Sequence, residues 1–485
     1  MRILTGIFFL LAVVTASAQI ESSAFTLTGK GVSTPFATDY HALGINPANL
    51  DLPPLFEGKN TTLGLAEFAV SLYSEALTKT ELRQNLLNEE VDEFTTAEQR
   101  EFAREFANTP LAVDIDVMAI GFAHKTQNAG AFGFNVRDRF DYYSEFGPLV
   151  SEITMLGYTA DYFDWLVLAS GDTIPNDGNF DEDTLDIVNG YTNLDDALNI
   201  RELIAGTELR MSWVREFNVG YGKRLNESED LEWYAGIGLK YLVGQGMLKL
   251  KADENTATGF SALSPVFDVD YDEIDDNNPS ALSSGSGSFT PVGRGFGIDV
   301  GITALIDKKL LLSASITDIG SMTWDGNLYS LKEQILLEYE NQGIESIDFV
   351  DQILELNGSD GLIEWEGKKT YTTKLPMTAR LGAGISTGEY LRVGADIALP
   401  LGDDVGSLER MQIAVGADYG LLEWLRLSAG FMQGGNYDFK IPAGITFVLA
   451  NGSYEAGIAS RDIVTYFTEN QPTVSLSMGF LRFRF

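Results

Sequence analysis

The chain has no cysteine, only two histidines and few basic residues. Without cysteine it cannot form a disulfide, supply a thiolate or carry a lipoprotein anchor. Its 33 Lys and Arg stand against 70 Asp and Glu, a net charge of −37, which argues against nucleic acid as a partner because phosphates are bound by basic residues. His41 and His124 are the only candidates for the general base of a Ser-His-Asp hydrolase, and neither has a suitable place. We therefore predict neither an enzyme nor a cofactor.

Long apolar runs are also scarce. After the first residues no segment has about 18 consecutive apolar residues, so no helical membrane span is predicted. At the N-terminus, Arg2 is followed by an apolar run of about 12 residues and then by Ala16-Ser17-Ala18, an arrangement typical of a secretory signal peptide. We expect residues 1–18 to be removed on export, which leaves Gln19 as the first mature residue.

The apolar content is instead spread out with a period of two. In 391–399 the odd-numbered positions are apolar, whereas Arg392, Gly394 and Asp396 lie on the other face. Such alternation is typical of strands with one face toward lipid and one toward a lumen. A secreted β-sandwich would give the same pattern. The strand count and the terminal aromatic residue favour an all-β, transmembrane antiparallel β-barrel over residues 61–485.

The alternation predicts about fourteen strands, an even number as in most bacterial barrels. Their connections separate by length: if the first strand runs outward, every connection at the inner end is short, and the long ones, 74–110, 141–208, 252–291 and 318–369, all fall at the outer end. This is the expected arrangement of short periplasmic turns and long external loops. The predicted strands are 61–73, 111–125, 130–140, 209–224, 232–251, 292–306, 309–317, 370–386, 390–400, 409–419, 423–434, 438–448, 453–465 and 471–485.

Two irregularities and two helices complete this prediction. The apolar alternation changes phase between Leu65 and Phe68 and again between Phe480 and Leu481, and a β-bulge would absorb one residue in each case. A capping box at 78–81 followed by apolar residues at helical spacing predicts a helix that reaches residue 106. A second helical stretch is predicted over 194–204. We expect these external helices to pack on one another as a cap.

Charged residues of both signs fall on the predicted lumenal face. They could pair across the lumen in a closed network, or line a polar path, and both interpretations remain open. Glycines on the same face leave room for an inserted segment, for which we assign residues 19–60 as a plug. The lumenal charge candidates are Arg137, Asp299, Arg380, Arg392, Asp396, Asp418 and Arg426.

The segment Ala42–Leu50 contains Asn46-Pro47-Ala48-Asn49 shortly before the first predicted strand. It resembles the Asn-Pro-Ala element of the long-chain fatty-acid transporter (FadL-like) outer-membrane barrels, which implies fourteen strands and an N-terminal hatch. The layout is similar to an uncharacterised family of Bacteroidota outer-membrane barrels, with which it shares this element, an early helical insertion and Asp318-Ile319-Gly320. Asn46 and Pro47 are therefore hinge candidates, and the alternative is a turn leading into the first strand.

The resemblance implies an outer-membrane protein whose final strand, with Phe483 and Phe485, is recognised by the barrel-assembly machinery. Our leading hypothesis is a passive channel or transporter for small hydrophobic or amphiphilic molecules. The alternative is a structural or interaction barrel whose external loops bind surface or secretion partners. The expected partners are outer-membrane lipid and the assembly machinery, with a small hydrophobic ligand under the first hypothesis and a surface protein under the second.

Overall fold

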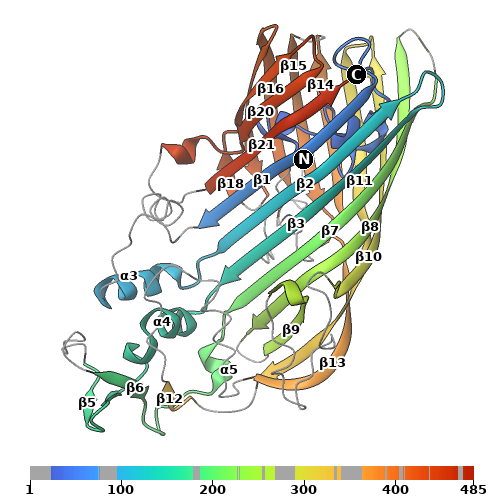
Figure 1. Cartoon of the computed structure of the whole chain (residues 1–485). Helices are drawn as coiled ribbons and strands as arrows, with labels where there is room; N and C mark the ends of the chain where they lie inside the picture. Colours follow the sequence, from blue (N-terminus) through green and yellow to red (C-terminus); the bar gives the residue numbers. More distant parts are fainter. Residues whose placement is uncertain are drawn as a thin grey trace, which may run out of the picture.

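A closed antiparallel β-barrel with fourteen strand positions forms the body of the molecule (Figure 1). The computed structural model describes residues 23–74, 76, 96–177, 186–226, 228, 230–253, 257–267, 290–331, 336–339, 363–387, 390–402, 408, 410–435, 437–467 and 473–485. The predicted signal peptide and most of the first predicted helix lie outside these residues. Pairing of the first barrel strand with the last closes the sheet.

Seventeen strands share the fourteen positions, because three positions are each occupied by two short strands that hydrogen-bond to the same neighbour. These pairs are β9 (Ala257–Leu263) with β10 (Gly293–Ile306), β13 (Ile363–Lys374) with β14 (Thr378–Ser386), and β18 (Tyr437–Lys440) with β19 (Ala443–Leu449). The other strands are β1 (Thr61–Ser74), β2 (Leu111–Lys125), β3 (Ala131–Glu145), β7 (Glu208–Arg224), β8 (Leu231–Ala252), β11 (Leu310–Leu331), β15 (Leu391–Pro400), β16 (Gln412–Leu422), β17 (Leu425–Gly434), β20 (Tyr454–Ser460) and β21 (Thr473–Arg484). The predicted barrel and its strand count are confirmed.

Two of the interrupted positions have a cause in the sequence. Pro376 lies between β13 and β14, and Pro442 lies between β18 and β19. Proline has no N–H to donate, so it interrupts the ladder at these points. The predicted strands 370–386 and 438–448 therefore each consist of two strands.

The two predicted phase changes are present and lie at one height of the wall. In β1 the inward side changes at Ala66, which has a φ of 52°, and in β21 it changes between Phe480 and Leu481. The β1–β21 register is the same on both sides of this point, whereas the β2–β3 and β20–β21 ladders shift there. The irregularity therefore crosses neighbouring strands, and it turns Glu67 into the lumen.

An apolar belt covers the outside of the barrel. Large side chains such as Val219, Leu239 and Phe296 are exposed there, with Phe296 at 68%. Between this belt and the end with the long connections, the outward face carries Asp138 and Arg215, which pair at 3.0 Å. Charged side chains on the lipid face are tolerated near an interface but not at the midplane, so this pair marks one border of the membrane-facing belt.

The wall is much longer on one side than on the other. Strands β8 and β11 have 22 residues each, whereas β14 has 9 and β20 has 7. Because about 10 residues cross a bilayer, the long strands extend well past the belt. The extended side carries the long connections (Figure 1).

Helices and a second sheet lie at the long-connection end. Helices α3 (Thr96–Phe106) and α4 (Pro148–Leu156) pack together, and β4 (Trp165–Leu168), β5 (Thr173–Pro175), β6 (Ile187–Tyr191) and β12 (Glu338–Tyr339) form a separate sheet. The prediction of a helix over 194–204 is wrong in extent, because only α5 (Ile200–Leu203), capped by Asn199, is helical. Among the described helices, none has the length and apolar character needed to cross a membrane.

Candidate functional site

The lumen is filled at its short-turn end by residues 23–56, called here the N-terminal segment. It contains three short helices, α1 (Phe25–Thr28), η1 (Asp39–Ala42) and η2 (Pro47–Asp51). Most of its side chains are buried, and the segment lies inside the barrel (Figure 1). Lys125 donates to the backbone carbonyls of Asp51 and Leu52 at this end. The assignment of residues 19–60 as a functional plug stays a proposal.

The two hinge candidates form the start of η2. The Asn46 side chain accepts a hydrogen bond from the Ala48 N–H at 3.2 Å, and Pro47 occupies the first turn, where its missing N–H costs nothing. The Asn46 amide also donates to Asn49 at 3.2 Å and to Thr303 on β10 at 3.0 Å. This element is therefore attached to the wall by its own side chains.

Inward-facing glycines provide the space for η2. A methyl group on Gly236 would overlap the backbone of Pro47 and Ala48, and one on Gly301 would overlap the Asn46 side chain. At these two positions the wall lies closer to the segment than a residue larger than glycine would permit.

Asp418 on β16 is the centre of one ion-pair cluster. It pairs with Lys30 of the N-terminal segment at 2.8 Å, with Arg392 at 2.7 Å and with Arg426. Burial and the charge of Arg392 lower the pKa of Lys30 to about 8, whereas Asp418 opposes this shift, so Lys30 is mainly protonated at neutral pH. Nearby, Asp396 accepts the N–H groups of Ser33 and Thr34, both at 2.8 Å.

A second cluster surrounds Glu67, beside the irregular row of the wall. Glu67 accepts from the Tyr40 hydroxyl at 2.5 Å and contacts His41 Nε2 at 2.6 Å. Arg482 of β21 pairs with Asp39 at 2.6 Å and with Glu455 at 2.6 Å. None of these six residues was assigned to a site from the sequence, and His41 was considered only as a general base. The change of phase in the apolar alternation between Leu65 and Phe68 was the sequence feature that could have indicated this cluster.

A layer of ion pairs crosses the lumen beyond the N-terminal segment. Arg137 pairs with Asp116 at 2.6 Å, and Lys240 pairs with Asp299 at 3.2 Å and Asp318 at 2.5 Å. The backbone N–H of Ser23 also donates to Asp116, at 2.8 Å, which joins the segment to this layer.

The structure brings six of the seven lumenal charge candidates into these contacts. Arg392, Arg426 and Asp418 share one cluster, Asp396 holds the segment, and Arg137 and Asp299 lie in the layer. Arg380 on β14 is half-buried opposite Ser315 and has no ion pair among the described residues. His124, the second histidine, contacts Thr61 at 2.8 Å on the exposed surface.

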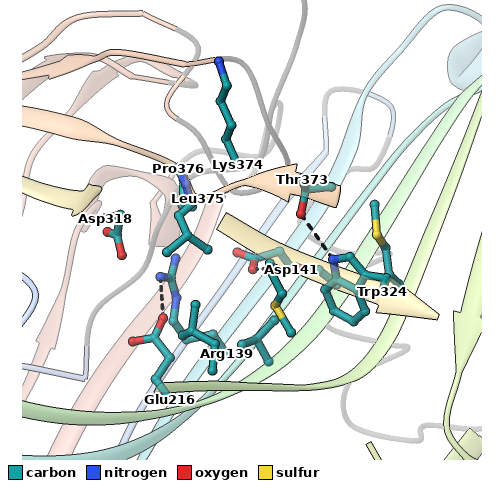
Figure 2. Close-up of a pocket in the computed structure, with 14 residues that line it drawn as sticks. Arg139, Asp141, Glu216, Asp318, Trp324, Thr373, Lys374, Leu375 and Pro376 are labelled. Carbon is teal, nitrogen blue, oxygen red and sulfur yellow. Dashed lines mark hydrogen bonds and ion pairs between the residues drawn. The ribbon is translucent and has the colours of Figure 1, made fainter. Parts of the chain in front are cut away.

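A cavity of about 60 Å³ follows the ion-pair layer on the side toward the long-connection end (Figure 2). One side is polar: Arg139 pairs with Glu216 at 3.1 Å, and Asp141 and Asp318 lie close by. The other side is apolar, and the indole of Trp324 donates to Thr373 at 3.2 Å. The apolar lining comprises Val214, Leu242, Met247, Met322, Trp324, Leu375 and Pro376.

The cavity is small for a transported molecule. An engineered cavity of about 150 Å³ binds one benzene molecule, so this smaller one cannot enclose a long-chain lipid in the present conformation. No set of residues able to hold a metal ion is found in the described part of the chain.

Solved structures resemble the chain over nearly its whole length at low identity. The toluene transporter TodX of Pseudomonas putida has 11% identity over 97% of this chain and 99% of its own, with a TM-score of 0.42. The toluene transporter TbuX of Ralstonia pickettii has 11% identity over 95% and 97%, with a TM-score of 0.44. A FadL homologue of Pseudomonas aeruginosa has 9% identity over 96% and 98%, with a TM-score of 0.39.

No curated protein matches the chain in sequence. The sequence signature of a family of unknown function, DUF5723, matches residues 171–449, which is more than half of the chain. The protein therefore belongs to the DUF5723 family.

Proposed function

We propose that this protein is an outer-membrane channel for small hydrophobic or amphiphilic molecules, closed at rest by its N-terminal segment. The observation that carries the proposal is the lumenal cavity, which is lined by apolar side chains on one side and by charged side chains on the other. Binding pockets for small molecules commonly combine a mostly apolar lining with a few polar groups. The exposed apolar belt supports placement in a lipid bilayer.

The N-terminal segment would have to move for passage. Its contacts with the wall combine hydrogen bonds and ion pairs, which water can replace, with two separate apolar clusters, one around Phe36 and one around Leu43. Asn46 and Pro47 are the proposed hinge because η2 begins there and the chain before it follows a different wall of the lumen.

The test compares conductance in planar bilayers for three proteins: wild type, Pro47→Ala and a deletion of residues 21–60. Replacing Pro47 frees φ and loosens the start of η2, so conductance should rise from wild type to Pro47→Ala. The deletion should conduct most. A folded deletion protein without conductance would contradict the channel, because the remaining wall would then seal the lumen.

One observation favours a second candidate, a structural or interaction barrel. The sheet of β4, β5, β6 and β12 and the α3–α4 pair form a folded structure outside the barrel, which is a suitable surface for a partner protein. A silent deletion protein, together with capture of a specific surface protein by this region, would support it.

A further inference from the structure

Two aspartates face each other across β2 and β3 on the cavity side of the lumen. Asp114 and Asp141 are direct cross-strand neighbours, are buried and lie within hydrogen-bonding reach of each other. Their flanking neighbours in the same row are Ser71 and Ser212, whose hydroxyls donate to them at 3.3 Å each. Two carboxyl groups in one site repel unless they share a proton or a cation.

The cations that line the cavity make no hydrogen bond to this pair. Arg139 is close enough for its charge to act on Asp141, but it donates to Glu216, as the dashed line in Figure 2 shows, and Lys374 extends away from the acidic groups. An incoming carboxylate would have to displace Glu216 from Arg139. An incoming ammonium group would meet Asp141 directly, since this residue lines the cavity.

The connections at this end of the barrel have a net charge of the same sign. The four long connections, 75–110, 146–207, 253–292 and 332–362, together contain 37 Asp and Glu but only six Lys and Arg. A surface of one sign raises the local concentration of oppositely charged solutes and repels those of like charge. Cations therefore reach this end of the barrel more readily than anions.

The apolar side of the cavity determines the size and chemistry of the ligand's apolar part. Trp324, Met247 and Met322 offer an aromatic face and two flexible thioethers, which suit a short alkyl group. At about 10–15 Å³ for each water-sized group, the cavity accepts roughly five non-hydrogen atoms.

We propose that the cavity selects small apolar molecules that carry a protonated amine, and that Asp141, supported by Asp114, binds the amine. This proposal rests on the proposed channel function and names its substrate class. Carboxylates of the same length are rejected, because Arg139, the lining cation on the polar side of the cavity, is already paired with Glu216.

The test measures binding by calorimetry to the full mature chain in non-ionic detergent at pH 7. The probes are n-butylamine, 1-butanol and butanoate, which share a four-carbon chain. A hydrogen bond to a charged group predicts that n-butylamine binds about tenfold more tightly than 1-butanol, with butanoate weakest. Asp141→Asn should remove this advantage and leave 1-butanol unchanged.

Two further variants make the result specific. Asp307→Asn removes a carboxylate from a short turn at the opposite end and should change nothing, since Asn tolerates its φ of 50°. Glu216→Gln frees Arg139 and should raise the affinity for butanoate about tenfold. Butanoate binding as tightly as n-butylamine to wild type would overturn the substrate class and leave the channel intact. If none of the probes binds and none enters proteoliposomes, the channel function itself fails.

Discussion

Asp418 shows how a single residue couples the N-terminal segment to the barrel wall. Its carboxylate is surrounded by Lys30, Arg392 and Arg426, and Lys30 lies 388 positions away in the chain. Removing one partner of a buried charge cluster is costly because the remaining charges stay desolvated.

We expect Asp418→Asn to lower the free energy of unfolding by about 3–5 kcal/mol, because three cations lose their common anion. Lys30→Met should cost less, because Asp418 keeps both arginines. Urea unfolding followed by gel mobility and tryptophan fluorescence measures both. Asp172→Asn, at an exposed position outside the barrel, is the matched control. Equal stability of Asp418→Asn and this control would show that the cluster is dispensable.

At the scale of the element, η2 and the glycines facing it form one unit. Gly236 on β8 is where the Pro47–Ala48 backbone meets the wall. A change there alters docking of the segment without changing the segment itself.

Gly236→Ala should therefore displace η2 and increase both the leak conductance and the protease sensitivity of the N-terminal segment. The reason is steric: the added methyl meets backbone atoms, which cannot yield as a side-chain end can. Gly402→Ala is the control, because a methyl there has no neighbouring atom within 4 Å. Wild-type conductance and protection in Gly236→Ala would place the rigid contact elsewhere.

At the scale of the whole molecule, closure of the barrel depends on β21. The backbone of Phe485 donates to Thr61 at 2.9 Å and accepts from Asn60 at 2.8 Å, and Arg482 pairs with Asp39 and Glu455. The last five residues thus join the two ends of the sheet and hold the N-terminal segment.

Deleting Leu481–Phe485 should abolish the compact, heat-modifiable form on gels and leave the protein sensitive to protease. An open barrel exposes unpaired strand edges, which the hydrocarbon region does not tolerate. Phe485→Tyr keeps the terminal aromatic ring and the backbone pairing, so it should insert normally. A truncated protein that inserts as wild type would show that Phe483 and Phe485 have no role in assembly.

The strand positions could be predicted because alternation is a local property of the pleat. Residues 391–399 show it directly, and β15 spans Leu391–Pro400. The predicted helix over 194–204 was too long because Leu194 at its start is 69% exposed, whereas Ile200 and Leu203, in the part that is helical, are buried. Helix α4 was missed, since its nine residues are too few for a clear helical period.

The all-β barrel, the inward side of strands with clear alternation and the concentration of acidic residues in the long connections could be predicted from the amino-acid sequence. Each of these follows from residues close together in the chain and from the two-residue period of a strand. Which lumenal charges pair depends on the folded barrel. Lys30 meets Asp418, and Arg482 meets Asp39, through register and closure of the whole sheet. The same holds for the Asp114–Asp141 pair, because a shift of one residue between β2 and β3 would separate the two carboxyl groups.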